Sequence, residues 1–158
     1  MTVIETPIRL VYSHTPGLAA SRFLRGLTEG RLLGQRCPSC RKVYVPPRGC
    51  CPMCGVATDE EVPLADRGVV TSFCVVNVPS PHLPLAVPYV CAQVLLDGAD
   101  ITTTFLLQEV EAGDVRMGMR VGAVWVEPAE RGPTLASIRY FRPTGEPDAA
   151  YESYREHA

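Results

Sequence analysis

The chain has 158 residues, of which 46% are hydrophobic and 20% are charged, and its formal net charge is -2. This composition is typical of a folded chain and excludes a largely disordered or low-complexity one. No apolar run approaches the roughly 20 residues that cross a bilayer, and the first residues lack the basic-then-apolar pattern of a signal peptide. We therefore expect a cytoplasmic protein that does not insert into membranes.

The charge is unevenly distributed along the chain. Residues 1–56 carry eight basic side chains against Glu5 and Glu29, a balance of +6, so the remaining residues sum to -8. A positive N-terminal part favours an anionic ligand or an acidic partner surface, although a solvated arginine-rich face gives the same pattern.

The N-terminal part predicts an extended arm followed by one helix. Up to Pro16 the sequence shows no sustained period. From Ala19 to Leu33, apolar residues return at helical spacing, with Ser21 as a candidate N-cap and Gly34 as a stop signal.

Two Cys-x-x-Cys steps follow, separated by ten residues that contain a short predicted strand at 43–45. A two-residue gap places two thiolates on one metal ion, and two such turns complete a tetrahedron. In a reducing cytosol, seven cysteines favour metal binding over disulfides. The sequence therefore predicts Zn²⁺ on Cys37, Cys40, Cys51 and Cys54. Because four thiolates leave no open coordination position, this zinc should be structural.

Other interpretations of the cysteines stay open. Iron in a rubredoxin-like site would use the same ligands and would make the protein a small redox carrier. Cys50 could replace Cys51 through a three-residue gap, although the matched two-residue gaps favour Cys51. Cys74 and Cys91 fall in apolar strands and are expected to be core residues.

After Pro63, five β-type runs follow one another without a helical pattern between them, which predicts a small closed barrel of the OB type. The runs cover residues 69–78, 89–96, 101–107, 120–126 and 134–141. Gly98 predicts a tight hairpin, and four prolines within 79–88 predict a stiff loop at the barrel mouth, where a ligand could bind. The aromatic residues expected in the barrel core are Phe73, Tyr89, Phe105, Trp125, Tyr140 and Phe141.

The predicted fold is mainly β and has four parts. They are an N-terminal arm and helix (1–34), a rubredoxin-like zinc ribbon (35–62), a five-stranded OB-fold barrel (63–145) and a C-terminal tail (146–158) that forms a short peripheral helix.

The sequence offers few catalytic groups, so we do not expect catalysis by this chain alone. It has three histidines, and it lacks a glycine-rich phosphate loop, a nucleophile elbow and a His-Glu-x-x-His step. His82, in the proline-rich loop, either points into a ligand channel or lies in solvent. OB barrels often bind single-stranded nucleic acid, but the -8 balance after residue 56 opposes phosphate binding. Nucleic-acid binding is therefore a minor alternative.

The order of helix, tetracysteine ribbon and OB barrel resembles a family of zinc-ribbon and OB-fold acyl-CoA-associated proteins, known as domain of unknown function thirty-five. The resemblance runs from Pro16 to Pro143. Its motifs are Glu29-Gly-Arg-Leu-Leu-Gly-Gln-Arg-Cys37, Tyr44-Val-Pro-Pro-Arg48, Gly68-Val-Val-Thr-Ser-Phe73, Pro88-Tyr89, Val115-Arg-Met-Gly-Met-Arg-Val121 and Phe141-Arg-Pro143.

The resemblance implies a non-catalytic accessory subunit that forms a hetero-oligomer with a thiolase-fold enzyme for thiolysis, retro-aldol cleavage or acyl transfer, in lipid or polyketide metabolism. A hotdog-fold enoyl-CoA hydratase is the alternative partner. The ribbon and helix would dock on the enzyme, and the barrel would help to hold an acyl-CoA thioester. Arginines suit the phosphates of CoA. The candidate ligand or partner contacts are Arg22, Arg25, Arg48 and His82.

Overall fold

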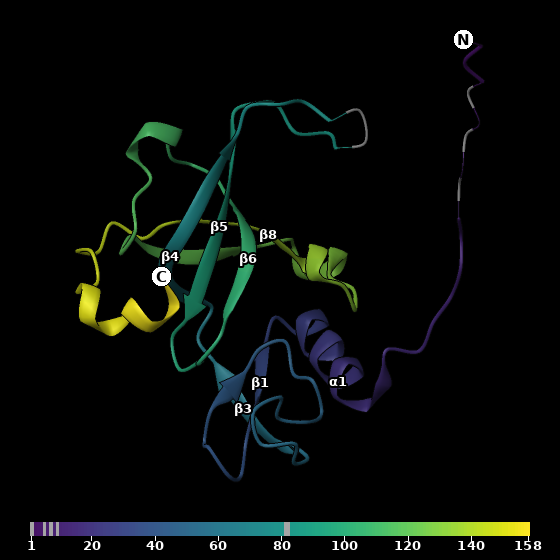
Figure 1. Cartoon of the computed structure of the whole chain (residues 1–158), viewed down its shortest axis with the longest axis vertical. Helices are drawn as coiled ribbons and strands as arrows, with labels where there is room; N and C mark the ends of the chain where they lie inside the picture. Colours follow the sequence, from purple (N-terminus) through teal and green to yellow (C-terminus); the bar gives the residue numbers. More distant parts are fainter. Residues whose placement is uncertain (1, 5, 7, 9, 81–82) are drawn as a thin grey trace.

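The computed structural model describes residues 2–4, 6, 8, 10–80 and 83–158, so His82 lies outside the described residues. An extended N-terminal arm leads into one helix, a small three-stranded sheet and a barrel (Figure 1). The helix and strands are α1 (Gly17–Thr28), β1 (Leu32–Arg36), β2 (Val43–Tyr44), β3 (Glu60–Leu64), β4 (Arg67–Val76), β5 (Tyr89–Leu96), β6 (Thr102–Leu107), β7 (Arg120–Trp125) and β8 (Ile138–Pro143).

The helix α1 is shorter than the apolar spacing predicts. It ends at Thr28, and its N-cap is Pro16 rather than Ser21. The prediction that the helix continues to Leu33 is wrong, because this residue is part of β1. Two adjacent buried leucines give the same apolar signal at the end of a helix and in a buried strand, so spacing alone does not separate the two cases.

The strand β1 is the centre of an antiparallel sheet with the order β2-β1-β3. Gly34, expected to stop the helix, lies inside β1. Neither β1 nor β3 was expected from the sequence. The sequence of β3, Glu-Glu-Val-Pro-Leu, is rich in residues that are uncommon in strands. This sheet is the scaffold of the cysteine ribbon.

The barrel is closed, with the strand order β4-β5-β6-β8-β7. All neighbours are antiparallel except β6 and β8, which run parallel where Leu107 faces Phe141. This is an OB-type barrel, so the predicted fold class is confirmed. Gly98 has a φ of +89°, which a residue with a Cβ rarely adopts, and it forms the predicted hairpin. Leu135–Ser137, expected to open the last strand, forms a 3₁₀ turn instead.

The helix, the ribbon and the barrel share one apolar core. Phe23 and Leu27 of α1 and Val45 of the ribbon pack in the same cluster as the interior of the barrel. That interior is filled by fully buried side chains, including Val70, Val94, Val121 and Phe141. The three parts therefore stabilise one another.

The expected aromatic core is buried only in part. Phe141 is fully buried and packs against Phe105, with the ring centroids 4.4 Å apart. Trp125 is half-buried and its Nε1–H donates to Asp66 Oδ2 at 3.2 Å. Phe73, in contrast, is 36% exposed, and Tyr89 and Tyr140 are half-buried.

The expectation that Cys74 and Cys91 are core residues is wrong, because Cys74 is exposed and Cys91 is only half-buried. The two strands that carry them, β4 and β5, extend past the closed part of the barrel toward the loop drawn partly in grey (Figure 1). An apolar run alone does not show which of its residues lie beyond the packed region.

The two ends of the chain differ in their contacts. The described part of the arm before α1 lies away from the body of the protein (Figure 1). The C-terminal segment forms two 3₁₀ turns, Tyr151–Ser153 and Arg155–His157, and Tyr154 packs against Val69 and Leu95 on the outside of the barrel. In the described part of the chain, no helix is long and apolar enough to span a membrane.

Replacing Leu27 tests the shared core. This side chain is fully buried between α1 and the barrel. Leu27→Ala should lower the free energy of unfolding by about 2–5 kcal/mol, because it leaves a cavity. Leu18→Ala, in the same helix but at an 80% exposed position, is the matched control and should change it by less than about 0.5 kcal/mol. Urea unfolding followed by circular dichroism measures both, and equal effects would contradict a shared core.

Candidate metal centre and ligand surfaces

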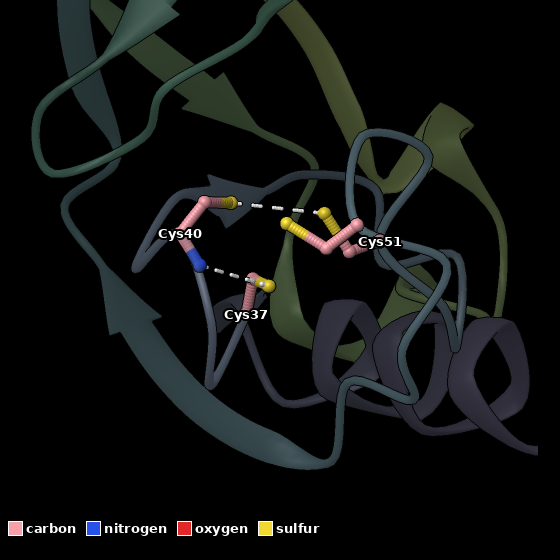
Figure 2. Close-up of side chains that lie close together, drawn as sticks. Cys37, Cys40 and Cys51 are labelled. Carbon is pink, nitrogen blue, oxygen red and sulfur yellow. Dashed lines mark hydrogen bonds between the residues drawn. The ribbon is translucent and has the colours of Figure 1, made fainter.

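The first Cys-x-x-Cys step leaves the end of β1 and turns back into β2. The backbone N–H of Cys37 donates to the Lys42 carbonyl at 2.9 Å, and the N–H of Arg41 donates to the Cys37 carbonyl at 3.0 Å. Arg41 has a φ of 66°, in the left-handed region. The N–H of Cys40 also donates to the Cys37 sulfur at 3.4 Å (Figure 2). This turn brings the two thiols together.

The second step repeats the turn at the same spacing. The N–H of Cys51 donates to the Val56 carbonyl at 2.8 Å, and the N–H of Gly55 donates to the Cys51 carbonyl at 2.9 Å. Gly55 takes the position of Arg41 and has nearly the same φ, 68°. Because the two turns match bond for bond, Cys51 corresponds to Cys37 and occupies the first position of its turn.

The four sulfur atoms of the two steps converge. Those of Cys37, Cys40, Cys51 and Cys54 all lie within 4.8 Å of one another. The sulfurs of Cys40 and Cys51 are 3.7 Å apart (Figure 2). Four thiolates at about 2.3 Å from a zinc ion have sulfur–sulfur distances of about 3.8 Å. The geometry thus fits a tetrahedral ion with no open position, and Cys50, which is exposed, is not part of the cluster.

The buried Tyr44 hydroxyl lies 3.3 Å from the Cys51 sulfur. Its hydrogen bond lowers the pKa of Cys51 to about 6, and the same contact raises the pKa of Tyr44. At Cys40 the Lys42 N–H favours the thiolate, but desolvation and the neighbouring sulfurs outweigh it and raise the pKa to about 11. One thiolate is therefore readily formed, and further thiolates beside it need a cation.

A buried polar contact holds the second turn against β1. The Gln35 side-chain oxygen accepts a hydrogen bond from the Gly49 N–H at 3.2 Å and another from the Thr58 hydroxyl at 3.1 Å. The Thr58 N–H in turn donates to the Gly49 carbonyl at 3.0 Å. Sequence reasoning gave no role to Gln35, Thr58 or the Tyr44 hydroxyl. Gln35 stands between Gly34 and Arg36 in the sequence, and this local pattern gives no signal for its role.

The candidate arginines do not form one cluster. Arg22 and Arg25 lie on the exposed side of α1 and line one groove of about 340 Å³ with Glu61, whose carboxylate is 3.5 Å from the Arg22 guanidinium. Arg25 also lines a second groove of about 410 Å³ with His14, Pro16, Ser21, Leu24 and Pro133. Arg48 is exposed on the ribbon and lines neither groove.

A third hollow, of about 350 Å³, lies at the barrel mouth between the start of β5 and the chain that follows β6. Its polar lining residues include Gln108, Glu109 and Glu111. Of these, Glu109 accepts hydrogen bonds from the Tyr140 hydroxyl at 2.6 Å and from the Arg142 guanidinium at 3.1 Å. These two contacts, the tyrosine first, lower the pKa of Glu109. The negative charge of Glu109 at the barrel mouth is therefore already balanced by Arg142.

Comparison with known families gives two matches along the chain. Residues 25–60 match the model described as "ChsH2, rubredoxin-like zinc ribbon domain", and residues 61–126 match "ChsH2, C-terminal OB-fold domain". Among solved structures, a chain of "Ltp2-ChsH2(DUF35) aldolase" superposes with a TM-score of 0.60 at 30% identity, over 80% of this chain and 95% of that one. The fold and the cysteine site thus define a zinc-ribbon and OB-fold protein.

Protein relatives give the particular family. A "DUF35 domain-containing scaffold protein" of Methanocaldococcus jannaschii is 38% identical over 103 residues, which are 64% of this chain and 72% of that protein. A "probable enoyl-CoA hydratase alpha subunit" of Thermomonospora curvata is 37% identical over 73% of this chain, but only 34% of that subunit is covered. A DUF35 protein of Sulfolobus solfataricus shares the fold, with a TM-score of 0.59 at 19% identity over 80% of this chain and 84% of that one. The chain belongs to the DUF35 family.

Removing one ligand tests the metal centre. Cys40→Ser should reduce bound zinc from about one ion per chain to nearly none and should destabilise the ribbon, because binding energy in such modules is largely folding energy. Cys50→Ser, next to the cluster but outside it, is the control and should keep its metal. Metal analysis of the purified proteins measures both. Loss of zinc from the Cys50 variant would show that Cys50, and not Cys51, is a metal ligand.

Replacing Tyr44 tests the hydrogen bond to the metal ligand. Tyr44→Phe removes only the hydroxyl that contacts the Cys51 sulfur. Zinc affinity should fall about tenfold, as is usual when a group that orients a metal ligand is lost. Competition with a chromophoric chelator measures this affinity, with Tyr12→Phe, at a 77% exposed position in the arm, as the control. Equal affinities for the two variants would show that the hydroxyl does not support the site.

Proposed function

We propose that this chain is a non-catalytic accessory subunit with a structural zinc ion, which assembles with a thiolase-fold enzyme and helps to hold its acyl-CoA substrate. The observation that carries the proposal is the 30% identical match to a chain of "Ltp2-ChsH2(DUF35) aldolase", which spans 95% of that chain. The M. jannaschii relative, which is named a scaffold protein, supports the same role. The reaction of the partner would be thiolysis, retro-aldol cleavage or acyl transfer.

The metal centre supports a structural role for zinc. All four ligands are thiols, so a tetrahedral ion would have no position for water or substrate. Zinc bound there would supply a cross-link between the two turns. The residues of this chain would hold the turns in register, with Tyr44 and Gln35 bracing the second one.

The surface of the helix and ribbon supports contact with a partner. Leu18 of α1 is 80% exposed and Met53 of the second turn is 76% exposed. In the arm, the described apolar side chains are similarly exposed, namely Val3, Ile4, Ile8, Leu10, Val11 and Tyr12. Burying these side chains against a partner would stabilise the complex.

The acyl-CoA would lie on the outside of this chain, because side chains fill the barrel interior. Arg22 and Arg25 suit its phosphates, since they face solvent in one groove. The contact between Arg22 and Glu61 is exposed on both sides, and such ion pairs contribute little, so a phosphate can replace it. The grooves are shallow, which fits a site that the partner completes.

A hotdog-fold enoyl-CoA hydratase is the second candidate partner. It is favoured by the name of the T. curvata relative, a probable enoyl-CoA hydratase alpha subunit. Binding of single-stranded nucleic acid is the third candidate, and the acidic balance of residues after 56 opposes it.

Co-expression tests the assembly. The chain should form a stable hetero-oligomer with a thiolase-fold protein of its own genome, measured by size-exclusion chromatography with light scattering. A complex with the hydratase alone would select the second partner. If the chain stays alone with both enzymes and leaves their activities unchanged, the accessory role is refuted.

Ligand binding is tested on the complex. Arg22→Glu with Arg25→Glu should weaken CoA binding about tenfold or more, because each well-formed arginine–phosphate contact contributes about 1.5–3 kcal/mol. Arg155→Glu, an exposed change of the same type in the C-terminal segment, is the control for a charge reversal outside the site. Calorimetric titration measures all three proteins, and unchanged affinity in the double variant would remove these arginines from the site.

A further inference from the structure

Cys74 and Cys91 face each other across two antiparallel strands. They are direct partners in the register of β4 and β5. Such partners have Cα atoms about 4.5–5.5 Å apart, which lies inside the range of about 4.4–6.8 Å that a disulfide requires. The neighbouring residues of β5, Val90 and Ala92, are buried in the barrel. Because side chains alternate along a strand, both cysteines lie on the outer face.

The two thiols also interact. Burial raises the pKa of Cys91, and the charge of the neighbouring Cys74 raises it further. Neither residue belongs to the metal cluster. The pair is therefore a separate dithiol.

The dithiol is open to solvent. Tyr154 of the C-terminal segment covers the outer face at Val69 and Leu95, closer to the other end of the two strands. Within the described residues, the backbone hydrogen bonds of β4 to the chain on its β7 side end at Val70, so Ser72–Val76 is paired with β5 alone. Cys74 is correspondingly exposed.

We propose that Cys74 and Cys91 form a reversible cross-strand disulfide when the protein meets a peroxide. The exposed Cys74 thiolate attacks one oxygen of hydrogen peroxide, and the O–O bond breaks to give a sulfenic acid and hydroxide, which takes up the thiol proton as water. The Cys91 sulfur then attacks the Cys74 sulfur, the S–O bond breaks and a second water leaves. Two thiols lose two electrons, and one peroxide becomes two waters.

The disulfide would join β4 to β5 beyond the point where β4 stops pairing with the chain on its β7 side. Leu85, Ala86 and Pro88, which precede β5, line the hollow at the barrel mouth, so the disulfide would lie near this hollow. A reversible disulfide of this kind in a reducing compartment is characteristic of redox-sensing sites rather than of structural ones. The site is independent of the proposed function, because it needs neither partner nor acyl-CoA.

Trypsin provides a readout that the metal ligands do not disturb. No Lys or Arg occurs between Gly68 and Val115, so residues 68–116 form one tryptic peptide, whose only cysteines are Cys74 and Cys91. The reduced, zinc-loaded full chain is treated briefly with hydrogen peroxide, unfolded in N-ethylmaleimide and digested. We expect two maleimide labels on this peptide before oxidation, none after it with a loss of about two mass units, and two again after dithiothreitol.

Two variants give the test its matched controls. Cys50→Ser keeps the pair and should behave as the unaltered chain. Cys91→Ala leaves Cys74 without a partner, so its peptide should keep the label or gain oxygen as a sulfenic, sulfinic or sulfonic acid, and should not show the loss of about two mass units. Retention of one or both labels by the oxidised unaltered chain would overturn the proposal. A cross-link from Cys74 to Cys50 or to a second chain would overturn it as well.

Discussion

The ribbon has too little apolar surface to hold its own shape, and four thiols occupy the place of a core. Its buried cluster consists of Cys37, Tyr44 and Cys51, against which Cys40, Cys54 and Ile101 pack. Modules of this size usually need a metal or a disulfide because they bury too little apolar area on folding. The two matched turns direct four sulfurs to one point, where a bound cation would replace the missing hydrophobic packing.

A few hydrogen bonds connect the ribbon to the barrel. Val43 directly follows the first turn. Its N–H donates to the Asp100 carboxylate at 2.7 Å, and its carbonyl accepts a hydrogen bond from the Asp100 N–H at 2.9 Å. The Thr103 hydroxyl donates to the Val45 carbonyl at 2.9 Å. Since Asp100 and Thr103 flank the start of β6, the position of the metal turns and the position of a barrel strand are set together. The helix that carries Arg22 and Arg25 rests on the same core, so the candidate ligand surface depends on it too.

Some of this arrangement was readable from the sequence, for identifiable reasons. Cysteine spacing encodes the turn geometry directly, so the four thiols could be paired without a structure. The barrel strands were predicted because Gly98 and the proline-rich segment separate apolar runs clearly. β1 and β3 were missed because Leu32 and Leu33 continue the spacing of the helix, and because Glu60–Leu64 forms a strand only by pairing with β1. The support from Gln35 and Thr58 depends on contacts between residues 23 positions apart, which no local pattern contains.

The filled barrel constrains how members of this family can diversify. Val94, Val121 and Phe141 are fully buried, so packing inside the barrel, and not contact with a small molecule, determines which side chains fit there. Changes that suit a new substrate or a new enzyme would fall on the arm, the helix face and the loops, where substitutions hardly affect the stability of the fold. The residues that would bind partners are therefore separate from those that stabilise the fold. One scaffold could adapt to different partner enzymes during evolution while its interior stays the same.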